Sequence, residues 1–331
     1  MQRHASNTSR RFPTLNISLL LGLMFFFVAC DVNNDDDFTP STGNSNSNGK
    51  MMGTSNVRSN GSVVKLGSVS AVSEGAIDLR MVASRMEIPR LKGNNDNLFV
   101  VHTVPTYDVN YCIEWDKSLR AQRWTAYRWD KRNSVNNTSR TNEWAEDPLI
   151  PIKDYNRTTL DDHKYNGYER GHMLGSQDRV NSYEANAQTF YMSNMHPQLS
   201  GFNGDGIWWN LENRLRSVYN KDSFRDTLYV VKGGTISGGM YTYDKNNNLI
   251  VPNYFFMALL RKRNNITANG GYAAVGFWMR HEANTDTTFK KYAVSIDELE
   301  ELTGIDFFCN LPDEIEKAVE QSYSTAVWQL N

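Results

Sequence analysis

The stretch Tyr168-Glu169-Arg170-Gly171-His172-Met173 places a glycine between two side chains suited to chemistry on an anion. In an extended segment, residues two apart project to the same face, so we expect the Arg170 guanidinium beside the His172 imidazole. An ordinary imidazole pKa of ~6.5 suits a general base near neutral pH, a role worth roughly 10²–10⁴ in rate. The stretch therefore predicts a site where an arginine binds an anionic group while a histidine takes a proton from water.

A second polar segment leads into a predicted helix further along the chain. Apolar residues at 207, 211, 215 and 218 recur at helical spacing, and Glu212 and Arg216 share one face of that helix. Asn203 lies just before the helix begins. Its amide oxygen is a hard neutral ligand, and Mg²⁺ held by few protein ligands keeps room for water and substrate oxygens.

The rest of the chain indicates an α+β fold with a central antiparallel sheet flanked by helices. Runs rich in β-branched and aromatic residues, separated by turn residues, predict strands. Ser295 with Glu298 forms a capping box for a helix that stops at Thr303-Gly304, and a last helix is expected from Pro312 to about Tyr323. The predicted strands cover residues 98–104, 111–115, 123–129, 227–231, 254–261 and 272–279.

The N-terminal region is typical of an exported lipoprotein. Residues 1–29 combine a basic start with a short apolar segment, which predicts a signal peptide, and Cys30 follows as a candidate for lipidation. Residues 30–61 are rich in Asn, Ser, Gly and Asp, which predicts a flexible linker. Residues 62–94 show no clear period and are left as an extension of uncertain order, and 95–331 are expected to form the main domain.

Overall charge and cysteine usage leave two questions open. The net charge of −2 provides no general attraction for a polyanion, so binding to nucleic acid would need a local cluster of Lys and Arg. Cys112 and Cys309 lie in apolar stretches, and an exported protein allows either a disulfide or two buried thiols.

Taken in order, these motifs resemble the DNA/RNA non-specific endonuclease family of the His-Me finger, or ββα-metal, class. The resemblance runs from about residue 95 to 325 and rests on spacing. Its elements are Arg170-Gly171-His172, the Asn-x-x-Pro-Gln pattern from Asn194 to Gln198, Phe202-Asn203, Gly206-x-Trp208-x-x-Leu211-Glu212, and Arg216.

This resemblance implies a role for each residue. His172 would be the general base and Asn203 the single direct ligand of Mg²⁺, with Mn²⁺ or another divalent cation as alternatives. Glu212 would order water on the metal. Arg170, Arg216 and Arg140 would bind the phosphates of DNA and RNA substrates. The reaction would leave 5′-phosphate ends without using the 2′-hydroxyl.

The chain departs from the family pattern in three places, one of which is the different spacing of the segment that carries Arg140. Glu169 stands where an aspartate is usual, and we expect it to orient its neighbours. Asn203 lies nine residues before Glu212, where the usual spacing is eight, so Asp205 becomes a rival or additional metal ligand. Asn194 and Gln198 are expected as supporting residues.

Two alternatives to a resident surface nuclease remain at this point. One is a non-catalytic surface protein that uses its arginines to hold polyanions, and the other is a nuclease toxin. The intact set of His172, Asn203 and Glu212 favours catalysis. The acidic residues behind Cys30 favour an enzyme anchored by lipid to a bacterial outer membrane, with its oligomeric state open.

Overall fold

The computed structural model describes residues 58–59, 61–105, 107–245 and 248–330. The predicted signal peptide over 1–29, the predicted lipidation site Cys30 and most of the predicted linker over 30–61 lie outside these residues. Within the described ranges, no helix combines the length and the apolar character needed to cross a membrane.

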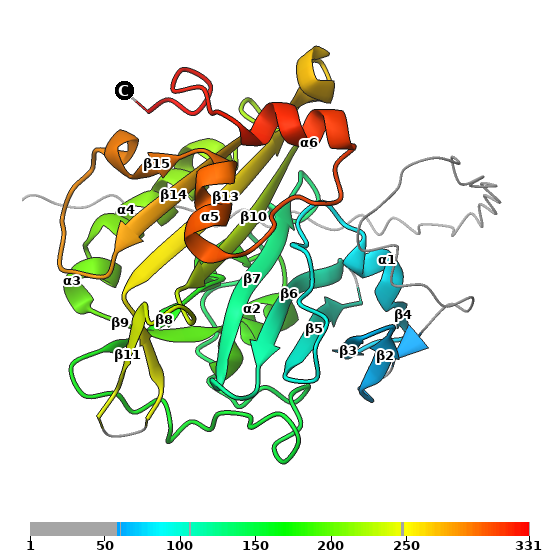
Figure 1. Ribbon diagram of the computed structural model, residues 1–331, viewed down its shortest axis with the longest axis vertical. Helices are drawn as coiled ribbons and strands as arrows, with labels where there is room; N and C mark the ends of the chain where they lie inside the picture. Colours follow the sequence, from blue (N-terminus) through cyan, green and yellow to red (C-terminus); the bar gives the residue numbers. More distant parts are fainter. Residues whose placement is uncertain (1–57, 60, 106, 246–247, 331) are drawn as a thin grey trace, which may run out of the picture. The chain divides into compact units, whose positions relative to one another are not determined.

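One nine-stranded sheet forms the centre of the part of the chain that the structure describes (Figure 1). Its neighbouring strands run antiparallel, except that β3 and β5 pair in parallel. This confirms the predicted α+β class with a central, mainly antiparallel sheet. In spatial order the strands are β15 (Ala293–Val294), β14 (Tyr272–Arg280), β13 (Tyr254–Lys262), β10 (Thr227–Gly234), β7 (Ala121–Trp129), β6 (Asp108–Asp116), β5 (Asn97–Val104), β3 (Val69–Ser73) and β2 (Val64–Leu66).

All six predicted strands are present, and residues 62–94 add two more strands to the main sheet. Each predicted strand extends slightly beyond its expected bounds, because pairing with a neighbour continues the hydrogen-bond ladder past the apolar run. Residues 62–94 form β2 and β3 at the edge of the sheet and then the short helix α1 (Leu79–Ala83). A small pair outside the main sheet joins β1 (Arg58–Ser59) to β4 (Ile77–Asp78).

Side chains alternate across the sheet and form a hydrophobic core on each face. On one face, Leu98 and Val100 belong to the same cluster as Leu211 of α4 (Ile207–Arg214). On the other, Phe99 belongs to the cluster that includes Leu299 of α5 (Ile296–Thr303) and residues of α6 (Asp313–Glu320). The helix α4 and the pair α5 and α6 therefore cover opposite faces.

Ser295 caps α5 as predicted, whereas the last helix is shorter than predicted. The Ser295 hydroxyl accepts a hydrogen bond from the Glu298 amide, and Gly304 ends α5 with a φ of 66°. Pro312 has an extended ψ of 134° and precedes α6, which ends at Glu320. The prediction that this helix reaches Tyr323 is wrong; that side chain instead donates a hydrogen bond to the backbone of β15, 3.1 Å away.

A separate strand pair and a helix carry the predicted site. Strand β8 (Glu169–His172) pairs antiparallel with β9 (Met195–Gln198), and the chain continues through α3 (Ser200–Asn203) into α4. Helix α2 (Tyr183–Gln188) lies between the two strands in sequence, and a further hairpin joins β11 (Tyr241–Tyr243) to β12 (Ile250–Pro252). The order strand, strand, helix agrees with the ββα arrangement that the resemblance implied.

Candidate active site

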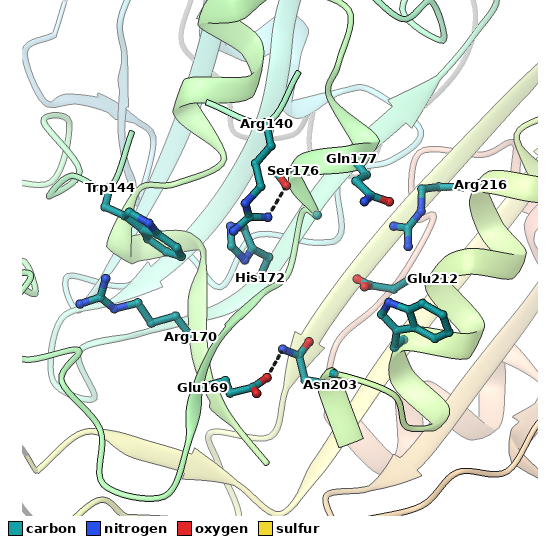
Figure 2. Close-up of a pocket in the computed structure, with 13 residues that line it drawn as sticks. Arg140, Trp144, Glu169, Arg170, His172, Ser176, Gln177, Asn203, Glu212 and Arg216 are labelled. Carbon is teal, nitrogen blue, oxygen red and sulfur yellow. Dashed lines mark hydrogen bonds between the residues drawn. The ribbon is translucent and has the colours of Figure 1, made fainter. Parts of the chain in front are cut away.

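The predicted residues converge on one cleft of about 550 Å³. They reach it from the segment after β7, from β8, from the end of α3, and from α4 with the π-helical turn Leu215–Tyr219 that extends it (Figure 2). These segments are far apart in sequence, so the fold itself assembles the site. The predicted residues that line the cleft are Arg140, Glu169, Arg170, His172, Asn203, Glu212 and Arg216.

Asn203 is oriented by Glu169. The Asn203 Nδ2 donates a hydrogen bond to Glu169 Oε2 at 3.0 Å, and this identifies which end of the amide is the nitrogen. In Figure 2 the amide oxygen points away from Glu169, toward the space between His172 and Glu212. Glu169 therefore binds the amide nitrogen of Asn203 and leaves the amide oxygen available as a ligand.

His172 lies in an aromatic and cationic surrounding. Its ring is 5.4 Å from that of Trp144 and 5.2 Å from that of Phe190, and its Nε2 is buried with no hydrogen-bond partner among the described residues. Burial, together with the nearby Arg140 guanidinium, lowers the pKa of His172 to about 3. The imidazole is therefore neutral at pH 7, with a pKa below the 6.5 assumed from sequence.

Two arginines form one wall of the cleft. Arg140 donates hydrogen bonds to Ser176 Oγ and Asn142 Oδ1, both at 2.7 Å. Arg170 lies with its guanidinium 5.0 Å from the Trp144 ring and donates to the backbone carbonyl of His163 at 3.0 Å. These contacts restrain both cations at the edge of the cleft, where an anion can reach them.

Glu212 and Arg216 belong to a buried network of charges behind the cleft. The fully buried Lys232 of β10 donates to Glu212 Oε1 at 2.8 Å and lies 3.5 Å from Asp178 Oδ2. Arg216 Nη1 donates to Asp178 Oδ1 at 2.9 Å, and the Tyr127 hydroxyl donates to the other oxygen at 3.0 Å. Glu212 and Arg216 thus share a face as predicted, but each pairs with a partner from another element.

Three of the predicted residues do not line the cleft. Asp205 is exposed in the turn between α3 and α4, so the structure does not bring the rival ligand to the site. Asn194 is buried, and its amide donates to the backbone carbonyls of Leu174 and Thr189 while its oxygen accepts from the Leu174 amide. Gln198 is buried opposite Glu169 in the strand pair. Both support the hairpin rather than the cleft.

Sequence reasoning missed several residues of the site. Lys232 carried a usable signal, because a single lysine within an apolar strand must have a buried partner. Asp178 stands in a short irregular segment without periodicity, and nothing local marks it. The unpredicted residues of the cleft wall are Trp144, Gly175, Ser176, Gln177, Gly204 and Trp209.

The two remaining cysteines do not form a disulfide with each other. Cys112 and Cys309 are both buried, the first in β6 and the second after α5. This excludes the disulfide between Cys112 and Cys309 that the sequence left open.

Known proteins share both the sequence pattern and the fold. The family model for DNA/RNA non-specific endonucleases matches residues 92–314, which is more than half of the chain. A nuclease of Nostoc sp. is 32% identical over 217 residues, covering 63% of this chain and 75% of the relative. Endonuclease G of Caenorhabditis elegans, a mitochondrial protein, is 30% identical over 224 residues, covering 63% and 68%. The solved EndoG/EndoGI complex has a similar fold, with a TM-score of 0.52 at 22% identity, over 61% of this chain and 84% of that one.

A ββα hairpin and helix that carry a histidine, an asparagine and several arginines in one cleft define a hydrolytic nuclease that acts on nucleic acids. The chain belongs to the DNA/RNA non-specific endonuclease family, whose members depend on a divalent metal. This membership argues against the alternative of a polyanion-binding protein without catalysis.

Proposed function

We propose that the protein hydrolyses phosphodiester bonds of both DNA and RNA in the presence of Mg²⁺, with His172 as the general base. One observation carries this proposal: His172, Asn203, Glu212 and three arginines line a single cleft. A neutral imidazole, a free amide oxygen and a cluster of cations are what attack by water on a phosphodiester requires.

The residues present fit a divalent cation at the end of α3. The Asn203 Nδ2 donates its hydrogen bond to Glu169, so the amide oxygen is left to bind the metal. The carboxylate of Glu212 lines the same cleft. Mg²⁺ or Mn²⁺ bound there would neutralise charge that develops on the phosphate oxygens.

Side chains of the protein carry out the proton transfer and the binding of the phosphate. His172 takes a proton from the attacking water, while Arg140, Arg170 and Arg216 hold the phosphate and oppose its growing negative charge. The bond from phosphorus to the 3′ oxygen breaks, and that oxygen takes up a proton from solvent, which leaves a 5′-phosphate and a 3′-hydroxyl. No group in this scheme uses the 2′-hydroxyl, which is why we expect both DNA and RNA to be substrates.

The test combines cleavage assays, metal removal and a matched pair of variants. Plasmid and RNA are incubated with the protein in Mg²⁺ or in EDTA, and the new ends are assayed for 5′-phosphate. We expect Asn203→Ala to need much more Mg²⁺ for half-maximal activity, whereas the control Asp205→Ala behaves as wild type. Cleavage that persists in EDTA, or ends that carry 3′-phosphate, would contradict the proposal.

We also propose that the protein is exported and anchored to the bacterial outer membrane as a resident surface enzyme. The support is the N-terminal pattern alone: a basic start, a short apolar segment, Cys30 and the acidic residues behind it. Expressed in its host with radiolabelled fatty acid, the wild type should carry label and sediment with membranes, and Cys30→Ser should do neither. A Cys30→Ser protein that still carries label would exclude this anchor.

A further inference from the structure

Three carboxylates converge between α5 and α6, on the sheet face opposite the one that α4 covers. Asp297 and Glu300 stand one helical turn apart on α5, and Glu320 is the last residue of α6. One carboxylate oxygen from each lies within 4.8 Å of the others. Since like charges at this distance repel, the arrangement needs a compensating group.

Glu320 needs a compensating group most, because its carboxylate is buried. Its side chain is only 6% exposed, and its Oε1 is buried with no hydrogen-bond partner among the described residues. A buried carboxylate without a partner is costly, so native proteins supply a proton, a cation or hydrogen bonds. Among the described residues, no hydrogen bond compensates the Glu320 carboxylate. This carboxylate lies close to those of Asp297 and Glu300.

The surroundings add negative charge rather than neutralising it. Arg90 pairs with Asp306 at 2.5 Å, while Glu316 contributes a further carboxylate. Burial and these neighbouring carboxylates raise the pKa of Glu320 to about 9, and burial raises the pKa of Glu300 to about 7. Ion pairs to Asp297, Glu300 and Glu320 are absent among the residues that the structure describes.

We propose that Asp297, Glu300 and Glu320 bind a calcium ion that joins α5 to α6. Calcium binds oxygen ligands at about 2.3–2.6 Å and accepts irregular geometry, and three carboxylate oxygens within 4.8 Å of one another can share one such ion. The exposed position of Asp297 leaves room for water to complete the shell. Glu300 is held in place because one of its oxygens accepts a hydrogen bond from the Phe307 amide at 2.7 Å.

The site is independent of the proposed nuclease chemistry. The helices α5 and α6 belong to one hydrophobic core, and α4 belongs to the core on the other face of the sheet. Loss of calcium at the acidic site should therefore lower stability without removing the groups of the cleft.

The test uses the full chain with calcium alone, thermal unfolding and titration calorimetry. Calcium should raise the unfolding temperature of the wild type and of Glu314→Gln, an exposed position on α6 outside the cluster. Glu320→Gln should weaken calcium binding by at least about tenfold and remove the temperature shift. Asn203→Ala should retain both, which separates this site from the cleft.

Two results would overturn the proposal. One is a wild type whose unfolding temperature does not respond to millimolar calcium, which would mean that protons alone neutralise the cluster. The other is unchanged calcium binding by Glu320→Gln. If Glu320→Gln does not fold, Asp297→Asn tests the same site from its exposed side.

Discussion

Lys232 is the buried cation that connects the catalytic helix to the sheet. Its ammonium group contacts Glu212 on one side and Asp178 on the other, and Asp178 also binds Arg216. Burying the two carboxylates costs free energy, and cations that pair with them, such as Lys232 and Arg216, offset this cost. The position of Glu212 in the cleft therefore depends on a residue that does not line it.

Lys232→Met tests this dependence. It keeps a long side chain but leaves Glu212 and Asp178 without their shared cation, so we expect a loss of roughly 3–5 kcal/mol in the free energy of unfolding and a lower kcat. Urea unfolding and initial cleavage rates provide the measurements. The exposed Lys221→Met is the matched control, and a Lys232→Met protein as stable and active as this control would refute the account.

His102 provides a prediction about pH. Its Nε2 lies 3.1 Å from Asp147 and its Nδ1 lies 3.4 Å from Glu74. Burial opposes protonation, but these carboxylates prevail and raise the pKa of His102 from 6.5 to about 10. Because the folded-state pKa is raised, this contribution to stability is complete below about pH 6.5 and is lost as the pH rises toward 10.

The measurement is the difference in the free energy of unfolding between wild type and His102→Gln across this pH range. The comparison isolates His102 from other groups that titrate in the same window. We expect the advantage of the wild type to shrink as the pH rises from 6.5 to 10. An advantage that grows over this range would show that His102 is not held in its charged form.

The turn between α3 and α4 sets the distance from Asn203 to Glu212. Gly206 caps α4, and a Cβ atom there would overlap the backbone of Gly201 and Phe202. A backbone cannot move aside as a flexible side chain can. The longer spacing noted in the sequence is thus accommodated by a turn that depends on this glycine.

Gly206→Ala should displace Asn203 relative to α4 and lower activity by at least about tenfold, since small misplacements of catalytic groups are costly. Gly171→Ala is the comparison, because its Cβ would meet the side chain of Gln198 instead of backbone. We expect Gln198→Ala to rescue Gly171→Ala, as judged by cleavage rates. A Gly206→Ala enzyme with wild-type activity would contradict this account of the turn.

The accuracy of sequence-based prediction varied with the kind of element. Long strands and the helix at 207–218 were predicted because period and composition are local properties. The strands β2 and β3 were not, since they are short and are stabilised by pairing along the sheet edge. In the cleft, ordered motifs identified seven of the residues that line it, whereas Asp178 and Lys232 depend on contacts between distant segments.

At the scale of the described molecule, the sheet separates the cleft from the acidic cluster. One face carries α4 and the residues of the nuclease cleft, and the other carries α5, α6 and the acidic cluster. Since α4 and α6 belong to different cores, we expect the effects of substitutions at the two sites on stability to add. The double variant Glu320→Gln with Lys232→Met checks this by urea unfolding; a sum that deviates by much more than about 0.5 kcal/mol would show coupling through the sheet.

The most direct test of the central claim is the rate at which His172→Ala cleaves plasmid DNA and RNA in saturating Mg²⁺. With folding verified by circular dichroism, the account predicts that both rates fall by about 10²–10⁴ relative to wild type. A His172→Ala enzyme that cleaves either substrate at the wild-type rate would show that this histidine is not the base.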